Sequence, residues 1–316
     1  MFSSMKRLSR SSCWRFAVGA LTLHSTLQKL TVCDDEEHSW KKKVRVSQKA
    51  VDDYVKSGMN LAVGTGSTGS IVIDRVSTKL KSQVLSNIRI IPGSEEMKRI
   101  CISLGIPVCS IDDVTTIHLA IVGADEVDPS LAMLKGRTGS FLREKMLEQA
   151  ANIVVVAVDD SKLARKLGFG APLPVEIIPF SHRFTRQQLE NLPSLKGSRA
   201  IVRVGSVGNN AADGEMIAVT DSGNYIVDIF FAEPLRDLNA TIKEIESVAG
   251  VVGHGLFMDL ATVLLVADNK GVYTIEKERI QNGDAGVPID SLWINSSMKL
   301  PLEREALDNR QPVQQE

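Results

Sequence analysis

Residues 153–158 read Ile-Val-Val-Val-Ala-Val, an apolar and mostly β-branched run with no polar residue inside it. A strand that is covered on both faces has this composition, whereas a strand with one face in water alternates apolar and polar residues. Three other short, mainly apolar runs lie upstream, at 60–63, 88–91 and 117–122. We therefore expect residues 153–158 to form an inner strand of a parallel sheet.

Helical patterns fill the intervals between these runs. The apolar spacing predicts four helices, over 46–55, 71–80, 95–104 and 141–151. Alternating strands and helices imply an α/β fold: an open, mostly parallel sheet flanked by helices, Rossmann-like in type. Two more strands are expected, at 107–110 and at 261–268. We assign the large domain to residues 39–171 and 253–278.

The pattern changes after Pro172, where a second and smaller domain is expected. The sequence predicts three strands and one helix, at 201–204, 216–220, 225–231 and 235–247. Asp221-Ser222-Gly223-Asn224 has the composition of a hairpin turn between the last two strands. We assign residues 172–252 to a small α+β domain.

The two ends of the chain differ from the rest. Residues 1–33 are basic and contain no acid, because Asp34 is the first. This composition is typical of an organelle transit peptide; a secretory signal and a disordered basic tail are the alternatives. We assign residues 1–38 to a targeting or disordered segment. The polar, aperiodic residues 279–316 are expected to be a disordered tail.

Composition argues against several classes of protein. The chain has 37 Lys and Arg against 38 Asp and Glu, and a net charge of −1 is unusual for a nucleic-acid-binding protein. No run of 18 apolar residues is present, so no membrane-spanning helix is expected. The four cysteines form no Cys-x-x-Cys pair and the five histidines form no metal-binding motif. We expect no disulfide framework, no metal and no cofactor.

The first candidate site is Gly64-Thr65-Gly66-Ser67-Thr68-Gly69, between a predicted strand and a predicted helix. It matches the Gly-x-Gly-x-x-Gly pattern of dinucleotide-binding turns, but no acid lies between Arg75 and Ser94 to bind a ribose. Backbone N–H groups at the start of a helix, together with three hydroxyl groups, suit a single phosphate. An ordinary tight turn with a Ser/Thr cap is the structural alternative.

Two further blocks and a lysine follow the other predicted strands. Gly123-Ala124-Asp125-Glu126-Val127-Asp128 comes directly after the strand at 117–122, at the edge where α/β sheets bind ligands. Lys135-Gly136-Arg137-Thr138-Gly139-Ser140 leads into the helix that carries Glu144, and Lys162 follows residues 153–158. Each also has a structural explanation: a solvated acidic turn, a glutamate stabilised near a helix start, and a solvated lysine.

Together the blocks place a phosphate-binding turn, Asp125, Lys135 and Glu144 along one edge of one sheet. This set of groups fits proton transfer next to the carbonyl of a phosphorylated sugar. A carboxylate would act as the base, and a cation would stabilise the developing enediolate.

The same blocks resemble type A ribose-5-phosphate isomerase. So do Pro172-Leu173-Pro174-Val175-Glu176 and the segments Gly250-Val251-Val252 and Gly255-Leu256-Phe257. The likeness extends over residues 40–278. The Lys-Gly-Arg form of the third block and the basic leader are most similar to the plant, plastid-directed branch.

The resemblance implies an isomerase that interconverts ribose 5-phosphate and ribulose 5-phosphate through an enediolate, without a metal. That reaction belongs to the pentose phosphate pathway and, in plastids, to the Calvin cycle. The resemblance also implies a homodimer or homotetramer. It favours the chloroplast stroma, with the cytoplasm as the alternative.

The resemblance also implies roles for individual residues. Glu144 matches the family's proton acceptor, with Asp125 and Lys135 as further catalytic residues. The residues that match substrate-binding positions are Thr65, Gly66, Ser67, Thr68, Gly123, Ala124, Asp125, Lys135, Gly136 and Lys162.

Two positions depart from the family pattern. Family members have an aspartate where this chain has Val122, and the plant branch has a glycine where this chain has Thr138. Val122 cannot accept a hydrogen bond from a sugar hydroxyl, and Thr138 would be strained if its φ angle were positive.

The departures leave two main hypotheses open. The first is a working isomerase, slowed on the order of a hundredfold by the loss of one polar partner. The second is a sugar-phosphate-binding protein that has lost turnover and acts as a sensor or as a subunit of mixed oligomers. A nicotinamide-dependent dehydrogenase is a third and weaker alternative.

Overall fold

The computed structural model describes residues 23–168, 170–205, 216–277, 280 and 292–293. The chain divides into two units, Met1–Lys42 and Lys43–Glu316. Helix α2 (Leu23–Tyr54) begins in the first unit, and the sheets and all other described helices lie in the second. Residues 1–22 of the expected targeting segment and nearly all of the expected tail at 279–316 lie outside the described residues.

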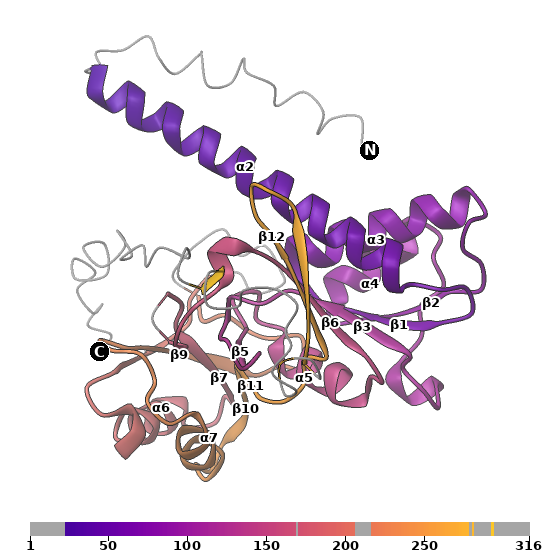
Figure 1. Ribbon diagram of the computed structural model, residues 1–316. Helices are drawn as coiled ribbons and strands as arrows, with labels where there is room; N and C mark the ends of the chain where they lie inside the picture. Colours follow the sequence, from indigo (N-terminus) through magenta and orange to yellow (C-terminus); the bar gives the residue numbers. More distant parts are fainter. Residues whose placement is uncertain (1–22, 169, 206–215, 278–279, 281–291, 294–316) are drawn as a thin grey trace. The chain divides into compact units, whose positions relative to one another are not determined.

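A six-stranded sheet with the strand order β13-β12-β6-β3-β1-β2 forms the centre of the second unit (Figure 1). Every neighbouring pair is parallel except β12 and β13, which are antiparallel. The strands are β1 (Asn60–Val63), β2 (Arg89–Pro92), β3 (Leu119–Val122), β6 (Val154–Asp159), β12 (Val263–Ala267) and β13 (Val272–Glu276). The prediction of an open, mostly parallel α/β sheet is confirmed, and β12 returns to it as expected.

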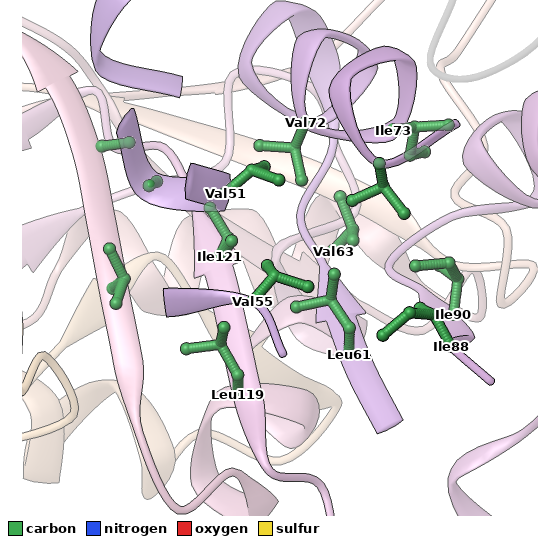
Figure 2. Packing of buried hydrophobic residues seen from close by; sticks show 14 of the residues in the cluster. Val51, Val55, Leu61, Val63, Val72, Ile73, Ile88, Ile90, Leu119 and Ile121 are labelled. Atoms are coloured by element: carbon green, nitrogen blue, oxygen red, sulfur yellow. The ribbon is translucent and has the colours of Figure 1, made fainter. Parts of the chain in front are cut away.

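Helices cover both faces of this sheet. Buried side chains from α2, α3 (Gly66–Lys81) and α4 (Glu95–Ser103) pack on one face, where Val51, Val72 and Ile73 meet strand residues such as Leu61 and Ile121 (Figure 2). Helix α5 (Phe141–Ala150) contributes Phe141 and Leu147 to the cluster on the opposite face.

The alternating orientation of the side chains in β6 explains the continuous apolar run. Val155 and Ala157 belong to the cluster beneath α2, α3 and α4, whereas Val154, Val156 and Val158 belong to the opposite cluster. All five side chains are buried. Since neither face of the strand meets water at these five positions, apolar side chains are favoured at all of them.

A second sheet has its own hydrophobic core. Its four antiparallel strands have the order β10-β7-β9-β8, and α6 (His182–Glu190) and α7 (Leu238–Glu246) pack against it. The strands are β7 (Leu173–Ile177), β8 (Arg199–Val202), β9 (Tyr225–Phe230) and β10 (Val251–His254). This smaller sheet with helices agrees with the α+β character expected for this part of the chain.

Several short elements complete the described structure. A three-stranded sheet consists of β11 (Leu256–Phe257), β5 (Met133–Leu134) and β4 (Glu126–Val127), in that order. Short 3-10 helices lie at Ile111–Asp113, Asp160–Lys162 and Pro193–Leu195. Among the described residues, no helix is long and apolar enough to cross a membrane.

Two expected strands are not regular strands. In the segment 107–110, Val108 makes one isolated bridge to Ile90 and no residue is buried. In the segment 216–220, Ile217 and Val219 make isolated bridges only, and Val219 is 47% exposed. In the second segment Ala218 and Thr220 are buried but Met216 is 61% exposed, so in both segments side-chain packing does not hold a longer ladder in register.

Two sets of polar contacts join other parts of the chain to β4 of the three-stranded sheet. The buried carboxylate of Glu126 accepts hydrogen bonds from the backbone N–H groups of Gly168, Gly170 and Ala171. The indole N–H of Trp293, which is 2% exposed, donates to the backbone carbonyl of Val127 at 3.1 Å. Trp293 is therefore part of the hydrophobic cluster that contains Val127.

We predict that Val155→Thr lowers the free energy of unfolding by about 1–3 kcal/mol, because it buries a hydroxyl group where the neighbouring side chains are apolar. The matched control is Val84→Thr, at a site that is 65% exposed, and it should change stability by less than about 0.5 kcal/mol. Denaturant unfolding of both variants measures the difference. Equal stability of the two variants would contradict burial of β6 on both faces.

Candidate active site

The carboxyl ends of β1, β3 and β6 lie at one edge of the large sheet, because these strands are parallel neighbours. A pocket of ≈ 290 Å³ lies where the loops that follow them meet helix α5. It is lined by Lys43, Thr65, Gly66, Ser67, Thr68, Gly123, Ala124, Asp125, Lys135, Gly136, Arg137, Thr138, Glu144 and Lys162. Every residue that the sequence indicated as a site residue is among them.

Glu144 lies in the first turn of α5 with its carboxylate turned away from bulk water. The residue is 5% exposed, on the same helix face as the buried Phe141 and Leu147. Its Oε1 accepts hydrogen bonds from the backbone N–H of Thr65 and from the Thr65 hydroxyl, each at 2.6 Å. The carboxylate therefore faces the Gly-Thr-Gly-Ser-Thr turn.

Lys135 brings a buried positive charge to the same carboxylate. Its Nζ lies 3.1 Å from Glu144 Oε2, 2.5 Å from Glu148 Oε1 and 5.0 Å from the centre of the Phe257 ring. Burial disfavours the charged form, but the carboxylates of Glu144 and Glu148 outweigh it and raise the pKa of Lys135. The ammonium group therefore stays charged at the back of the pocket.

The turn after β1 is built to approach an anion closely. Thr65 is the N-cap of α3, but its hydroxyl bonds to Glu144 and makes no capping bond to the helix, so no side-chain cap covers the first backbone N–H groups of α3. Gly66 has a φ of +70°, in the left-handed region that favours glycine. Ser67 and Thr68, which follow it, also line the pocket.

The second and third loops complete the wall of the pocket. Gly123 and Ala124 follow β3, and Asp125 Oδ2 accepts the backbone N–H of Arg137 at 3.0 Å. Asp125 thereby holds the loop that carries Lys135, Gly136 and Thr138 against the loop after β3.

The charge of the pocket favours an anionic ligand. Its lining has four cations and two carboxylates, a net charge of +2 with all six ionised: Lys43, Lys135, Arg137, Lys162, Asp125 and Glu144. Among the described residues, no group of three His, Cys, Asp or Glu side chains is placed to hold a metal ion.

Three residues near the site escaped the sequence analysis. Lys43 belongs to the run Lys41-Lys42-Lys43, which gives no sign that one member faces a pocket. Arg137 lies in the block of residues 135–140, but the sequence indicated no role for it. Glu148 lies four residues after Glu144, a spacing that places both on one helix face and could have been noticed.

The two departures from the family pattern have different structural consequences. Val122 is buried at the end of β3. If Gly64 carried a Cβ, that atom would lie 3.2 Å from Val122 Cγ1 and 3.2 Å from Glu144 Oε1. Thr138 has no positive φ, so the strain considered for it does not arise; the left-handed positions in that loop are Gly136 and Gly139. The Thr138 hydroxyl instead lies 2.6 Å from that of Thr65.

Comparison with known proteins gives consistent matches. The model of the family described as Ribose 5-phosphate isomerase A (phosphoriboisomerase A) matches residues 89–271. Over 229 residues the chain is 43% identical to the probable ribose-5-phosphate isomerase 2 of Arabidopsis thaliana, covering 72% of this chain and 84% of that protein.

Two further matches agree with the first. The probable ribose-5-phosphate isomerase 3, chloroplastic, of Arabidopsis thaliana is 42% identical over 73% of this chain and 81% of its own length. The solved structure of ribose 5-phosphate isomerase from Plasmodium falciparum is similar with a TM-score of 0.70 at 35% identity, covering 75% of this chain and 98% of that one.

We predict that Gly136→Ala destabilises the protein by about 1–3 kcal/mol. Gly136 has a φ of +125°, and an added Cβ would meet Pro174 and lie 2.7 Å from Phe141 Cδ1. Gly271→Ala is the matched control, because a Cβ there meets no atom within 4 Å. Thermal unfolding should show a clear fall in Tm for the first variant only; equal values would contradict the described loop conformation.

Proposed function

The chain belongs to the ribose 5-phosphate isomerase A family, whose members interconvert D-ribose 5-phosphate and D-ribulose 5-phosphate, and we propose that Glu144 transfers the proton in this chain. One observation carries the proposal. A buried carboxylate is held between the Thr65 turn and the ammonium group of Lys135, inside a pocket with an excess of positive charge.

The chemistry requires a base and a group that stabilises negative charge. Glu144 takes the proton from C2 of the open-chain aldose, and the electrons of the C–H bond form an enediolate. Return of the same proton to C1, with a proton moved from O2 to O1, gives the ketose. The Lys135 ammonium group stabilises the negative oxygen of the enediolate.

We assign the phosphate of the substrate to the turn after β1. The first backbone N–H groups of α3 and the hydroxyl groups of Ser67 and Thr68 suit a dianion. Lys162 adds a positive charge to the same pocket. The backbone of Gly123, Ala124 and Gly136 lines the sugar, and Asp125 positions the loop that carries Lys135.

The rate of this enzyme is proposed to be reduced. Val122 Cγ1 and Glu144 Oε1 each lie 3.2 Å from where a Cβ on Gly64 would be, and Val122 offers no hydrogen bond where an aspartate would offer one. Thr138 adds a side chain beside Gly66, since its Cγ2 lies 3.0 Å from where a Cβ on Gly66 would be. The alternative function, a sugar-phosphate-binding protein without turnover, rests on these same two residues.

We further propose a homo-oligomer, either a dimer or a tetramer. Its supporting observation is a set of apolar side chains exposed around α6, since Phe180 is 80% exposed and Phe184 is 60% exposed. Sedimentation of the purified protein gives the number of subunits.

We propose a chloroplast location. One Arabidopsis relative is described as chloroplastic, and residues 1–33 of this chain are basic and free of acids.

We also propose the domain limits expected from the sequence: a large domain of residues 39–171 and 253–278, and a small domain of residues 172–252. The return of β12 to the six-stranded sheet supports these limits.

Glu144→Gln is expected to lower kcat for ribose 5-phosphate by about 10²–10⁴-fold, because an amide cannot accept the C2 proton. The substrate should still bind in calorimetry, since the phosphate turn is unchanged. Glu96→Gln, an exposed carboxylate on α4, is the control and should keep the rate of the unchanged protein. A Glu144→Gln variant with full rate would disprove the base assignment.

Val122→Asp is expected to raise kcat/KM on the order of tenfold by restoring a polar partner beside Glu144. Val122→Asn has similar size without the charge and separates hydrogen bonding from charge. A coupled assay of the unchanged protein and both variants measures the effect. If the unchanged protein binds ribose 5-phosphate and turns over none, the binding-protein alternative holds.

A further inference from the structure

Glu148 is a second buried carboxylate one helical turn after Glu144. Glu148 is 2% exposed and Glu144 is 5% exposed, and both lie on the same face of α5. Two like charges at this spacing repel each other, and water cannot screen them inside the protein. A partner must therefore offset the repulsion.

That partner is Lys135. Its Nζ lies closer to Glu148 Oε1, at 2.5 Å, than to Glu144 Oε2, at 3.1 Å. An ammonium group has three N–H donors, so two can serve the two carboxylates while the third remains for the substrate. Glu148 does not line the pocket, so its influence on the substrate must pass through Lys135.

The charge of Glu148 depends on its surroundings. Burial raises its pKa to about 7, Lys135 and Lys145 oppose this rise, and Glu144 adds to it. Among the described residues, none donates a hydrogen bond to Glu148 Oε2. Near neutral pH, Glu148 therefore exchanges between a neutral acid and a carboxylate.

We propose that Glu148 is a positioning residue of the isomerase: as a second counter-ion, it keeps Lys135 in place while Glu144 carries the substrate's proton. This inference rests on the proposed function of Glu144 and Lys135. When Glu144 becomes neutral, Lys135 loses one of its two negative neighbours. Without Glu148, the Lys135 ammonium group, on a residue that is 2% exposed, would then have no anionic partner among the described residues and would follow the enediolate out of position.

A second ammonium group lies near this cluster. Lys145 Nζ lies 4.9 Å from the centre of the Phe257 ring, and Lys135 Nζ lies 5.0 Å from the same centre.

The test is the pH dependence of kcat in Glu148→Gln, which keeps the shape of the side chain and removes its charge. Below about pH 6 the two enzymes should have similar kcat, because Glu148 is then protonated in the unchanged protein. The ratio of their kcat values should rise through pH 7 to about tenfold at pH 8.5. KM should change little, since Glu148 lies outside the pocket.

Two further variants separate positioning from a structural effect. Glu148→Asp keeps the charge on a shorter side chain and should keep the inflection near pH 7. Glu176→Gln is the matched control: it removes another buried carboxylate, in the four-stranded sheet, and should leave the profile unchanged. A ratio of one at every pH, or a uniform loss at every pH, would overturn the proposal.

A measurement without turnover completes the test. Carbon-13 NMR of the glutamate carboxyl groups should show one that titrates near pH 7 in the unchanged protein and is missing in Glu148→Asp. Its absence from the unchanged protein would overturn the inference, even if Glu148→Gln does not fold. If the unchanged protein shows this titration but no isomerase activity, it is the proposed function that fails.

Discussion

The carboxylate of Glu144 joins three segments, of which the turn after β1 lies 79 residues before Glu144 in the sequence. It accepts two hydrogen bonds from Thr65 in the turn after β1, it lies 3.1 Å from Lys135 in the loop after β5, and it belongs to the first turn of α5. A buried carboxylate without such partners would be costly, so the three segments must meet for the site to be stable. The same contacts set both the proposed base and the proposed phosphate turn in position.

Much of the large sheet could be predicted because four of its strands, β1, β3, β6 and β12, are covered on both faces. The apolar run at 153–158 is typical of a fully buried strand, and the buried strands beside it have similar apolar runs. The strand β7 was missed because Pro174 and Glu176 are unusual in a buried strand. Glu176 is tolerated there since its carboxylate accepts hydrogen bonds from Thr220 and Asn224, which are distant in the sequence.

The residues of the site were predictable as blocks, but their contacts were not. The turn at 64–69 and the glutamate at 144 each have an ordinary structural explanation, and only the fold brings them together. Whether Thr138 strained its loop depended on its φ angle, which no composition rule supplies. Lys43 reached the pocket from a helix whose charged run gave no directional signal.

Trp293 limits how far the chain can be shortened from its C-terminal end without loss of core packing. Its indole ring fills part of the core beside β4 and donates a hydrogen bond to Val127, whose neighbour Glu126 holds the loop at 168–171. A protein shortened after β13, to aid crystallisation or to attach a reporter, would lose this side chain and leave a cavity in the apolar cluster that contains Val127. Fusion partners are better joined beyond residue 293.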